Sequence, residues 1–223
     1  MPEKEIEIVY DEKELADLGA APRIPLIWQN AVGASEFAMF SPVFQNGAVY
    51  AAAEDGQLVS LDPATGKENW KIDTEHQLSG GVGAGESLVL VGTFMGEVLA
   101  FDEAGKNLWK AQVTSEVLSA PQAERSFVAV RSGDGRIFGL DSVDGSRKWV
   151  YQGETPSLTV RSSVGLYMSR GAIFAGFPGG KMVAMSLFNG NVGWEAAVSQ
   201  PRGVTELERM TDITSLPVVD EQV

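Results

Sequence analysis

The segment Val59–Trp70, VSLDPATGKENW, decides the fold, because three further copies of its pattern follow it along the chain. Each copy places a glycine four residues before a tryptophan, and the tryptophans stand 39, 40 and 45 residues apart. Repetition at about 40 residues indicates a repeat architecture, in which each copy is one supersecondary unit. The four copies end at Trp70, Trp109, Trp149 and Trp194.

Each repeat contains the signals of four short strands. Alternating apolar runs flank glycine-containing tips, a pattern typical of β-hairpins. After the third run comes an aspartate, at Asp62, Asp102 and Asp141, or Ser186 in the fourth copy. Aspartate followed by glycine is turn chemistry, because the carboxylate accepts nearby N–H groups and glycine supplies a positive φ. We therefore assign the aspartates and tryptophans structural roles. Four antiparallel strands per repeat predict the blades of a β-propeller.

The repeats also divide the chain into segments. Residues 1–24 are charged and precede the repeats, so we expect them to form an arm. Residues 25–32 carry Trp28 and are predicted to be a closing strand. We place the blades at about 40–73, 79–114, 118–152 and 162–198, with opening strands near Ser41, Ser79, Ser119 and Ser162, and the start of a fifth blade at 214–223.

An open stack of four blades leaves two apolar faces uncovered. We infer that the chain is part of a longer propeller. One hypothesis is that two such chains associate and cover the open faces.

The composition narrows the function classes. A net charge of −13 argues against binding nucleic acid or an anionic lipid surface. Cysteine is absent, which excludes thiolate chemistry. His76 is the only histidine, and we expect it at the surface or between blades rather than in a catalytic triad or a multi-histidine metal site.

Gly80–Gly85 (GGVGAG) runs into an apolar strand pattern instead of a helix, which argues against a dinucleotide loop. The sequence predicts no catalytic residue, no metal site and no cofactor.

The repeat resembles that of the quinoprotein-type (PQQ-like) propellers, most clearly in LDPATGKENW and LDSVDGSRKW. The enzymes of that superfamily are alcohol and glucose dehydrogenases that carry PQQ and calcium. This chain is short and has no insertion that could cage such a cofactor. A ligand-sensing or enzymatic PQQ-like propeller stays open as an alternative, as does an adaptor propeller with another partner.

Two long connections are similar to those of one branch of this superfamily. PSLTVRSS (Pro156–Ser163) and the segment Val198–Val219 resemble the BamB family, the B lipoprotein of the bacterial β-barrel assembly (Bam) machinery. This resemblance implies an eight-bladed, non-enzymatic scaffold, tethered by an N-terminal lipid to the periplasmic side of the outer membrane. It also implies binding to the POTRA domains of BamA and to other Bam subunits, with nascent outer-membrane proteins as further partners.

The resemblance also implies which residues contact the partner. The first connection carries an apolar-x-apolar-Arg element, with Leu158, Val160 and Arg161 as partner-binding residues. In the second connection Asp212 matches the first of two family aspartates, and Thr214 stands where the family has the second. Two further residues match the family as an ion pair that shapes this loop, namely Glu206 and Arg209.

Overall fold

The computed structural model describes residues 25–153, 163–199, 211–213 and 215–217. The described chain forms four separate sheets of four antiparallel strands, with one 3-10 turn at Pro178–Gly180 and no α-helix among these residues. The predicted all-β propeller fold is therefore confirmed. The expected arm at 1–24 lies outside the described residues.

Each sheet is a meander, in which strands that follow one another along the chain are hydrogen-bonded neighbours. The first two sheets contain β1 (Val43–Gln45), β2 (Ala48–Ala52), β3 (Gln57–Leu61), β4 (Glu68–Asp73), β5 (Leu78–Gly85), β6 (Leu88–Thr93), β7 (Glu97–Asp102) and β8 (Asn107–Gln112). The third and fourth contain β9 (Gln122–Glu124), β10 (Phe127–Arg131), β11 (Arg136–Asp141), β12 (Arg147–Gln152), β13 (Tyr167–Ser169), β14 (Ala172–Phe177), β15 (Lys181–Ser186) and β16 (Val192–Ala197).

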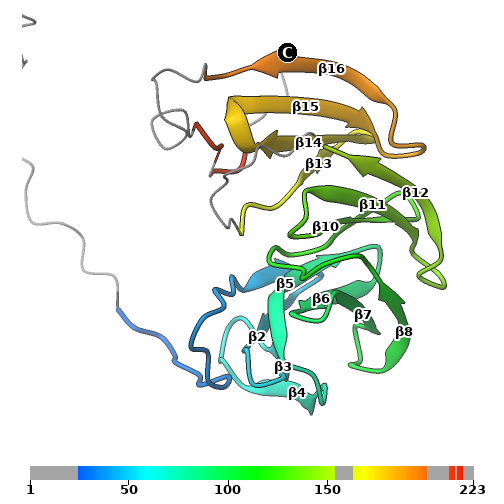
Figure 1. The fold of residues 1–223 in the computed structure, drawn as a ribbon. Coiled ribbons are helices and arrows are strands. Elements are labelled where there is room, and N and C mark those ends of the chain that lie inside the picture. Colours follow the sequence, from blue (N-terminus) through cyan, green and yellow to red (C-terminus); the bar gives the residue numbers. More distant parts are fainter. Residues whose placement is uncertain (1–24, 154–162, 200–210, 214, 218–223) are drawn as a thin grey trace, which may run out of the picture.

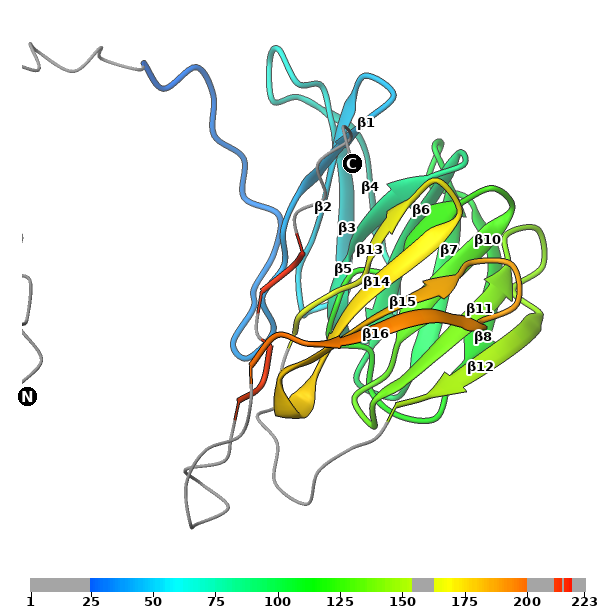
Figure 2. The same ribbon diagram turned by 90° about the horizontal axis from the view of Figure 1, so that it is seen from above.

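The sheets are arranged side by side like the blades of a fan (Figures 1 and 2). Their first strands are close to one another, with β5 in contact with both β1 and β9, and β9 in contact with β13. The last strands, β4, β8, β12 and β16, form the outer rim. This is the radial arrangement of propeller blades.

The core is divided between neighbouring sheets, because the side chains of a strand alternate between its two faces. On β6, Leu88 and Leu90 belong to the apolar cluster shared with the third sheet. Val89 and Val91, on the opposite face, belong to the cluster shared with the first sheet. A third cluster lies between the third and fourth sheets. Both faces of the central blades are thus buried, which explains the uninterrupted apolar runs 88–91, 98–101 and 127–130 in their inner strands.

The repeated tryptophan links each blade to the turn of the next one. Its indole N–H donates a hydrogen bond to a backbone carbonyl in the following turn, which runs from the repeat aspartate, or from Ser186 in the fourth repeat, to the turn glycine. The four bonds are Trp28 Nε1 to Pro63 O (2.9 Å), Trp70 Nε1 to Glu103 O (2.8 Å), Trp109 Nε1 to Ser142 O (2.9 Å) and Trp149 Nε1 to Leu187 O (2.9 Å). The ring therefore covers a turn that lies in the neighbouring sheet.

The glycine of the turn makes this contact sterically possible. Gly145 has a φ of +71°, in the left-handed region that favours glycine. A Cβ atom added there would lie 2.6 Å from Cε3 of Trp109. The equivalent glycines, Gly66, Gly105 and Gly190, also have positive φ and face the tryptophan of the preceding unit. A side chain at these positions would strain the turn and displace the indole.

The side chains of the repeat aspartates accept hydrogen bonds from N–H groups within the same turns. Asp62 Oδ1 accepts hydrogen bonds from the hydroxyl and the N–H of Thr65, both 2.7 Å away, and from Ala64 N–H at 3.1 Å. These bonds, led by the Thr65 hydroxyl, lower the pKa of Asp62 below its usual value. Asp102 and Asp141 bond their own turns in the same way, and Ser186 Oγ accepts from Phe188 N–H at 3.3 Å.

The structure differs from the sequence-based expectations at several strands. No strand is assigned at 25–32, although Trp28 is docked on the first turn. A strand needs a ladder partner, and no described segment pairs with residues 25–32. No strand is assigned at 215–217 either, and the rest of the expected fifth blade at 214–223 lies outside the described residues.

The opening strands of the third and fourth sheets begin after the serines at which we expected them. β9 starts at Gln122 rather than near Ser119, directly after Pro121, whose nitrogen has no hydrogen to donate to a ladder. β13 starts at Tyr167, whereas Ser162 lies outside the described residues.

Gly80–Gly85 lies within β5, close to the backbone of β9 and of the connection that leads into it. A Cβ atom at Gly80 would come within 2.5 Å of Val117 O, and one at Gly85 within 2.7 Å of Ala123 O. These glycines therefore allow close approach between blades, as the strand interpretation of this stretch requires.

The last tryptophan is in a different environment. Trp194 on β16 is 46% exposed, whereas Trp109 is 7% exposed. No turn of another sheet covers Trp194 within the described part of the chain. Its ring instead packs against Phe174 of its own sheet, with centroids 6.2 Å apart.

Replacing a docked tryptophan should destabilise the fold more than replacing the exposed one. We expect Trp109→Ala to lower the free energy of unfolding by about 3–5 kcal/mol, the usual cost of removing a buried tryptophan. Trp194→Ala should cost about 1 kcal/mol. Urea denaturation followed by circular dichroism measures both; equal losses would contradict a stabilising role for the indole contact.

The ring contact at the glycine turn can be separated from backbone strain. Gly47 has a φ of +80° but a Cβ atom there would meet no other atom within 4 Å, so Gly47→Ala tests strain alone. That substitution should cost about 1–2 kcal/mol. Gly145→Ala should cost clearly more, because it also pushes against Trp109. Similar melting temperatures for the two variants would show that the ring moves aside freely.

Candidate protein-binding face

The candidate site is one end of the blades, which we call the connection face. In a meander, successive turns lie at alternate ends of the sheet. The connection face is formed by the tips between the second and third strands of each sheet and by the connections from one sheet to the next. The tips are 53–56, 94–96, 132–135 and 178–180, and the described parts of the connections are 74–77, 113–121, 153, 163–166, 198–199 and 211–213.

Hydrogen bonds fasten the tips to the connections. The carbonyl oxygen of the tip glycine accepts from the first residues after the fourth strand: Gly56 O from Thr74 N (2.9 Å), Gly96 O from Val113 N (2.8 Å) and Gly180 O from Val198 N (2.8 Å). Gln112 adds a side-chain bond, from Nε2 to Met95 O at 2.8 Å. Because their backbone groups are paired, these loops form a firm platform for exposed side chains.

A carboxylate orders the segment that enters the first sheet. Glu54 Oε2 accepts three backbone N–H bonds, from Glu36 (2.9 Å), Phe37 (2.8 Å) and Ala38 (3.0 Å). Its Oε1 accepts from Gln77 Nε2 at 3.0 Å. The bonds from Ala38, Phe37 and Glu36 lower the pKa of Glu54 to about 2. The ionised carboxylate therefore holds this segment against the tip at 53–56.

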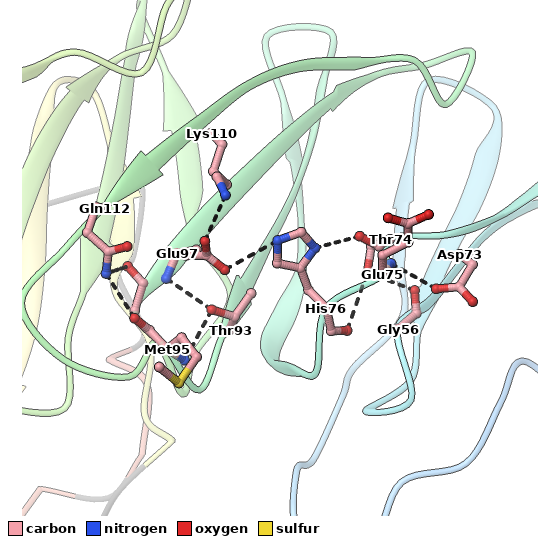
Figure 3. Close-up of polar contacts among 11 residues, drawn as sticks. Gly56, Asp73, Thr74, Glu75, His76, Thr93, Met95, Glu97, Lys110 and Gln112 are labelled. Atoms are coloured by element: carbon pink, nitrogen blue, oxygen red, sulfur yellow. Dashed lines mark hydrogen bonds and ion pairs between the residues drawn. The ribbon is translucent and has the colours of Figure 1, made fainter.

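The single histidine joins the first two sheets (Figure 3). His76 Nδ1 lies 2.5 Å from Thr74 O, and Nε2 lies 3.4 Å from Glu97 Oε2 on β7. Glu97 Oε1 in turn pairs with Lys110 Nζ on β8, at 2.9 Å. Both ring nitrogens thus have oxygen partners within the chain, so His76 links two blades, one of the two positions that the sequence left open.

Most of the partner-binding residues expected from the sequence lie outside the described residues. These are Leu158, Val160, Arg161 and Thr214, together with the expected loop-shaping pair, Glu206 and Arg209. Asp212 is described and half-buried, and its Oδ1 accepts from Gly179 N–H at 3.1 Å. Asp212 thus ties the second long connection to the tip of the fourth sheet.

Sequence reasoning missed Arg131, at the end of β10. Its guanidinium donates to Gly176 O at 2.7 Å and to Val164 O at 3.5 Å, and it lies over the ring of Phe177, 5.2 Å from the centroid. Burial lowers the pKa of Arg131. This contact fixes the described end of the connection that carries Leu158 and Arg161. An arginine ending an apolar strand gives no sequence signal for such a role.

Two further observations concern candidate metal-binding groups and candidate membrane-spanning helices. In the described ranges, His, Asp and Glu side chains do not gather in groups of three or more that could hold a metal ion. No helix in the same ranges is long and apolar enough to cross a membrane.

Comparison with known proteins decides the family. The family model described as "Outer membrane protein assembly factor BamB" matches residues 25–77 and 54–223, which is most of the chain. This chain belongs to the BamB family. A curated BamB of Nitrosomonas eutropha is 58% identical over 218 residues, covering 98% of this chain and 53% of that protein.

Solved structures agree on the fold. The crystal structure of BamB from Moraxella catarrhalis matches with a TM-score of 0.75 at 24% identity, covering 82% of this chain and 56% of that one. A europium-containing methanol dehydrogenase matches with a TM-score of 0.65 at 14% identity, covering 78% of this chain and 44% of the enzyme. At such identities these likenesses concern the fold alone. The chain spans about half the length of the curated BamB relatives it matches.

The lowered pKa of Glu54 leads to a prediction of how the stability of the fold depends on pH. The pKa of Glu54 is lowered from an ordinary value near 4.5 to about 2 on folding. Its contribution is therefore complete above about pH 5 and is lost as the pH falls through 4.5 towards 2. We expect Glu54→Gln to lower the melting temperature at pH 7, with a difference from the parent that shrinks below pH 4.

The control for this prediction is Glu68→Gln, which removes one charge from an exposed position on β4. It should leave the pH profile of the melting temperature nearly unchanged. A constant difference between Glu54→Gln and the parent from pH 7 to pH 2 would contradict the role of the ionised carboxylate.

Proposed function

We propose that this chain is part of a non-enzymatic scaffold of the outer-membrane protein assembly (Bam) complex. The observation that carries the proposal is the family match, which extends over nearly the whole chain and whose curated members are named assembly factors. The scaffold would act by binding the POTRA domains of BamA and other Bam subunits at the periplasmic side of the outer membrane. In this proposal a lipid on the parent protein supplies the membrane anchor.

The connection face suits such a role physically. Its tips and connections are held by backbone hydrogen bonds, so these loops would lose little conformational entropy on binding a partner. The proposed contact consists of Leu158, Val160 and Arg161 on one connection and Asp212 and Thr214 on the next. An apolar pair beside an arginine has the composition of a small binding hot spot. Arg131, at the end of β10, donates to Val164 O on the first connection, and Asp212 ties the second connection to the tip at Gly179.

The alternative is a quinoprotein-type enzyme or a ligand sensor. The methanol dehydrogenase shares the fold at 14% identity, and fold likeness alone carries no activity. The BamB match is the more specific finding, so we favour the scaffold. A melting temperature raised by PQQ with calcium would instead favour the alternative.

The proposal is tested by measuring binding to purified BamA POTRA domains. We expect the protein to bind and the variant Leu158→Ala/Arg161→Ala to bind at least about tenfold more weakly, because a hot-spot truncation costs more than about 1.4 kcal/mol. Circular dichroism should show the same β spectrum for both.

The matched control is Val143→Ala/Arg147→Ala, which removes an exposed apolar and an exposed basic side chain at the opposite end of the third sheet. This variant should bind like the parent. Equal weakening by both double variants, or none by either, would overturn the assignment of the binding loop.

A further inference from the structure

The segment Ala34–Met39 presents two apolar side chains that the fold does not bury. Phe37 is 75% exposed and Met39 is 78% exposed, whereas Phe40 next to them packs against the core between the first two sheets. Glu54 binds three backbone N–H groups of this segment. These bonds hold the backbone of the segment in place, with the side chains of Phe37 and Met39 exposed to solvent.

A small hollow opens beside these two residues on the connection face; we call it the apolar hollow because five of its seven lining residues are apolar and two are serines. It has a volume of about 140 Å³, and its wall is completed by the first strand of the second sheet, the tip of that sheet and two connections. The lining residues are Phe37, Ala38, Met39, Ser79, Phe94, Leu118 and Ser163. Small-molecule sites usually measure about 300–1,000 Å³, so this hollow is of the size for one inserted side chain.

An acidic hollow of about 580 Å³ lies along the same segment. It is lined by five carboxylate residues, Glu36, Glu54, Asp55, Asp73 and Glu75, and by Ala34, Ser35, His76 and Gln77. The lining contains no lysine or arginine, and His76 is engaged with Glu97. Internal N–H groups bind Glu54, Asp55 and Asp73. With five carboxylates and no lysine or arginine in its lining, the hollow carries a net negative charge.

The two hollows share one wall. Ala34, Ser35 and Glu36 line the acidic hollow, and the next three residues, Phe37, Ala38 and Met39, line the apolar one. Exposed apolar side chains rimmed by polar groups indicate an interaction site. The neighbouring negative charge selects the occupant, because a partner with cations beside its apolar group is attracted and an acidic one is repelled.

We propose that these two hollows bind an extended polypeptide segment that carries a large apolar side chain next to lysine or arginine. The apolar side chain enters the hollow beside Phe37 and Met39, and the cation faces the carboxylates on the other side of the shared wall. An extended chain suits this surface because it can place neighbouring side chains on the two sides of a ridge. The lining of the two hollows does not include Asp212, and the proposal does not depend on the proposed binding of BamA.

The test is fluorescence anisotropy with a short labelled peptide in which lysines flank a phenylalanine. Two companion peptides replace the phenylalanine by serine or the lysines by glutamate. We expect the first peptide to bind, with an affinity that falls as salt is added, and each companion to bind at least about tenfold more weakly. Equal binding of the three peptides, or no binding of the first, would overturn the proposal.

Protein variants place the site. Phe37→Ser/Met39→Ser keeps the backbone bonds to Glu54 and should weaken binding of the first peptide about tenfold or more. Glu36→Gln/Glu75→Gln should weaken it and reduce its salt dependence. The matched control, Phe44→Ser/Val143→Ser, removes two exposed apolar side chains outside both hollows and should bind like the parent. Equal binding by Phe37→Ser/Met39→Ser and the parent would overturn the proposal.

Two further readouts distinguish a peptide site from a dimer interface and from the POTRA-binding surface. If the occupant is instead a second copy of the chain, light scattering will show a dimer that Phe37→Ser/Met39→Ser dissociates, and that result would overturn the peptide proposal. Binding of POTRA domains by the same variant should equal that of the parent. Its loss together with peptide binding would show that the two surfaces are one and would overturn the separate site.

Discussion

The contact between a tryptophan and the turn of the next blade is the interaction on which the whole structure depends. One indole supplies both a hydrogen bond to a turn carbonyl and a large apolar face that covers a glycine. Trp28, Trp70, Trp109 and Trp149 make this contact in four successive turns. Each contact joins residues that are 33 to 38 positions apart. A local turn is thereby converted into a link between sheets.

This link explains the composition of the blades. Because each of the two central sheets is clamped between two neighbours, its inner strands are buried on both faces, and residues such as Leu90 and Val91 serve two different cores. Within these inner strands, charged residues such as Glu97, Arg131 and Arg136 lie at the strand ends. The same constraint keeps the turn glycines free of side chains, since both a positive φ and a ring contact act on them.

In our proposals, recognition takes place at one end of the blades. On the connection face, carboxylates, amides and backbone groups order the loops, with Glu54 and Asp212 as the clearest examples. A scaffold protein needs such ordered loops more than it needs reactive groups, because preorganised loops lose little entropy on binding. Both of our proposals place protein contact at this face, the first resting on the BamB family match and the second on the exposed residues Phe37 and Met39.

The four copies of the repeat that begins at Val59 were sufficient to determine the all-β propeller fold and the turn chemistry of residues such as Asp62 and Gly66, because these depend on local patterns and their repetition. The family likewise followed from the sequence of two connections. Contacts across the chain could not be derived in this way. That Glu54 binds the backbone of residues 36–38, that Arg131 supports Val164, and that an apolar hollow adjoins an acidic one were decided by the tertiary structure alone. The physical reason is that hydrogen bonds to backbone groups and the shape of a surface carry no residue pattern, since they depend on which segments the folded sheets bring together.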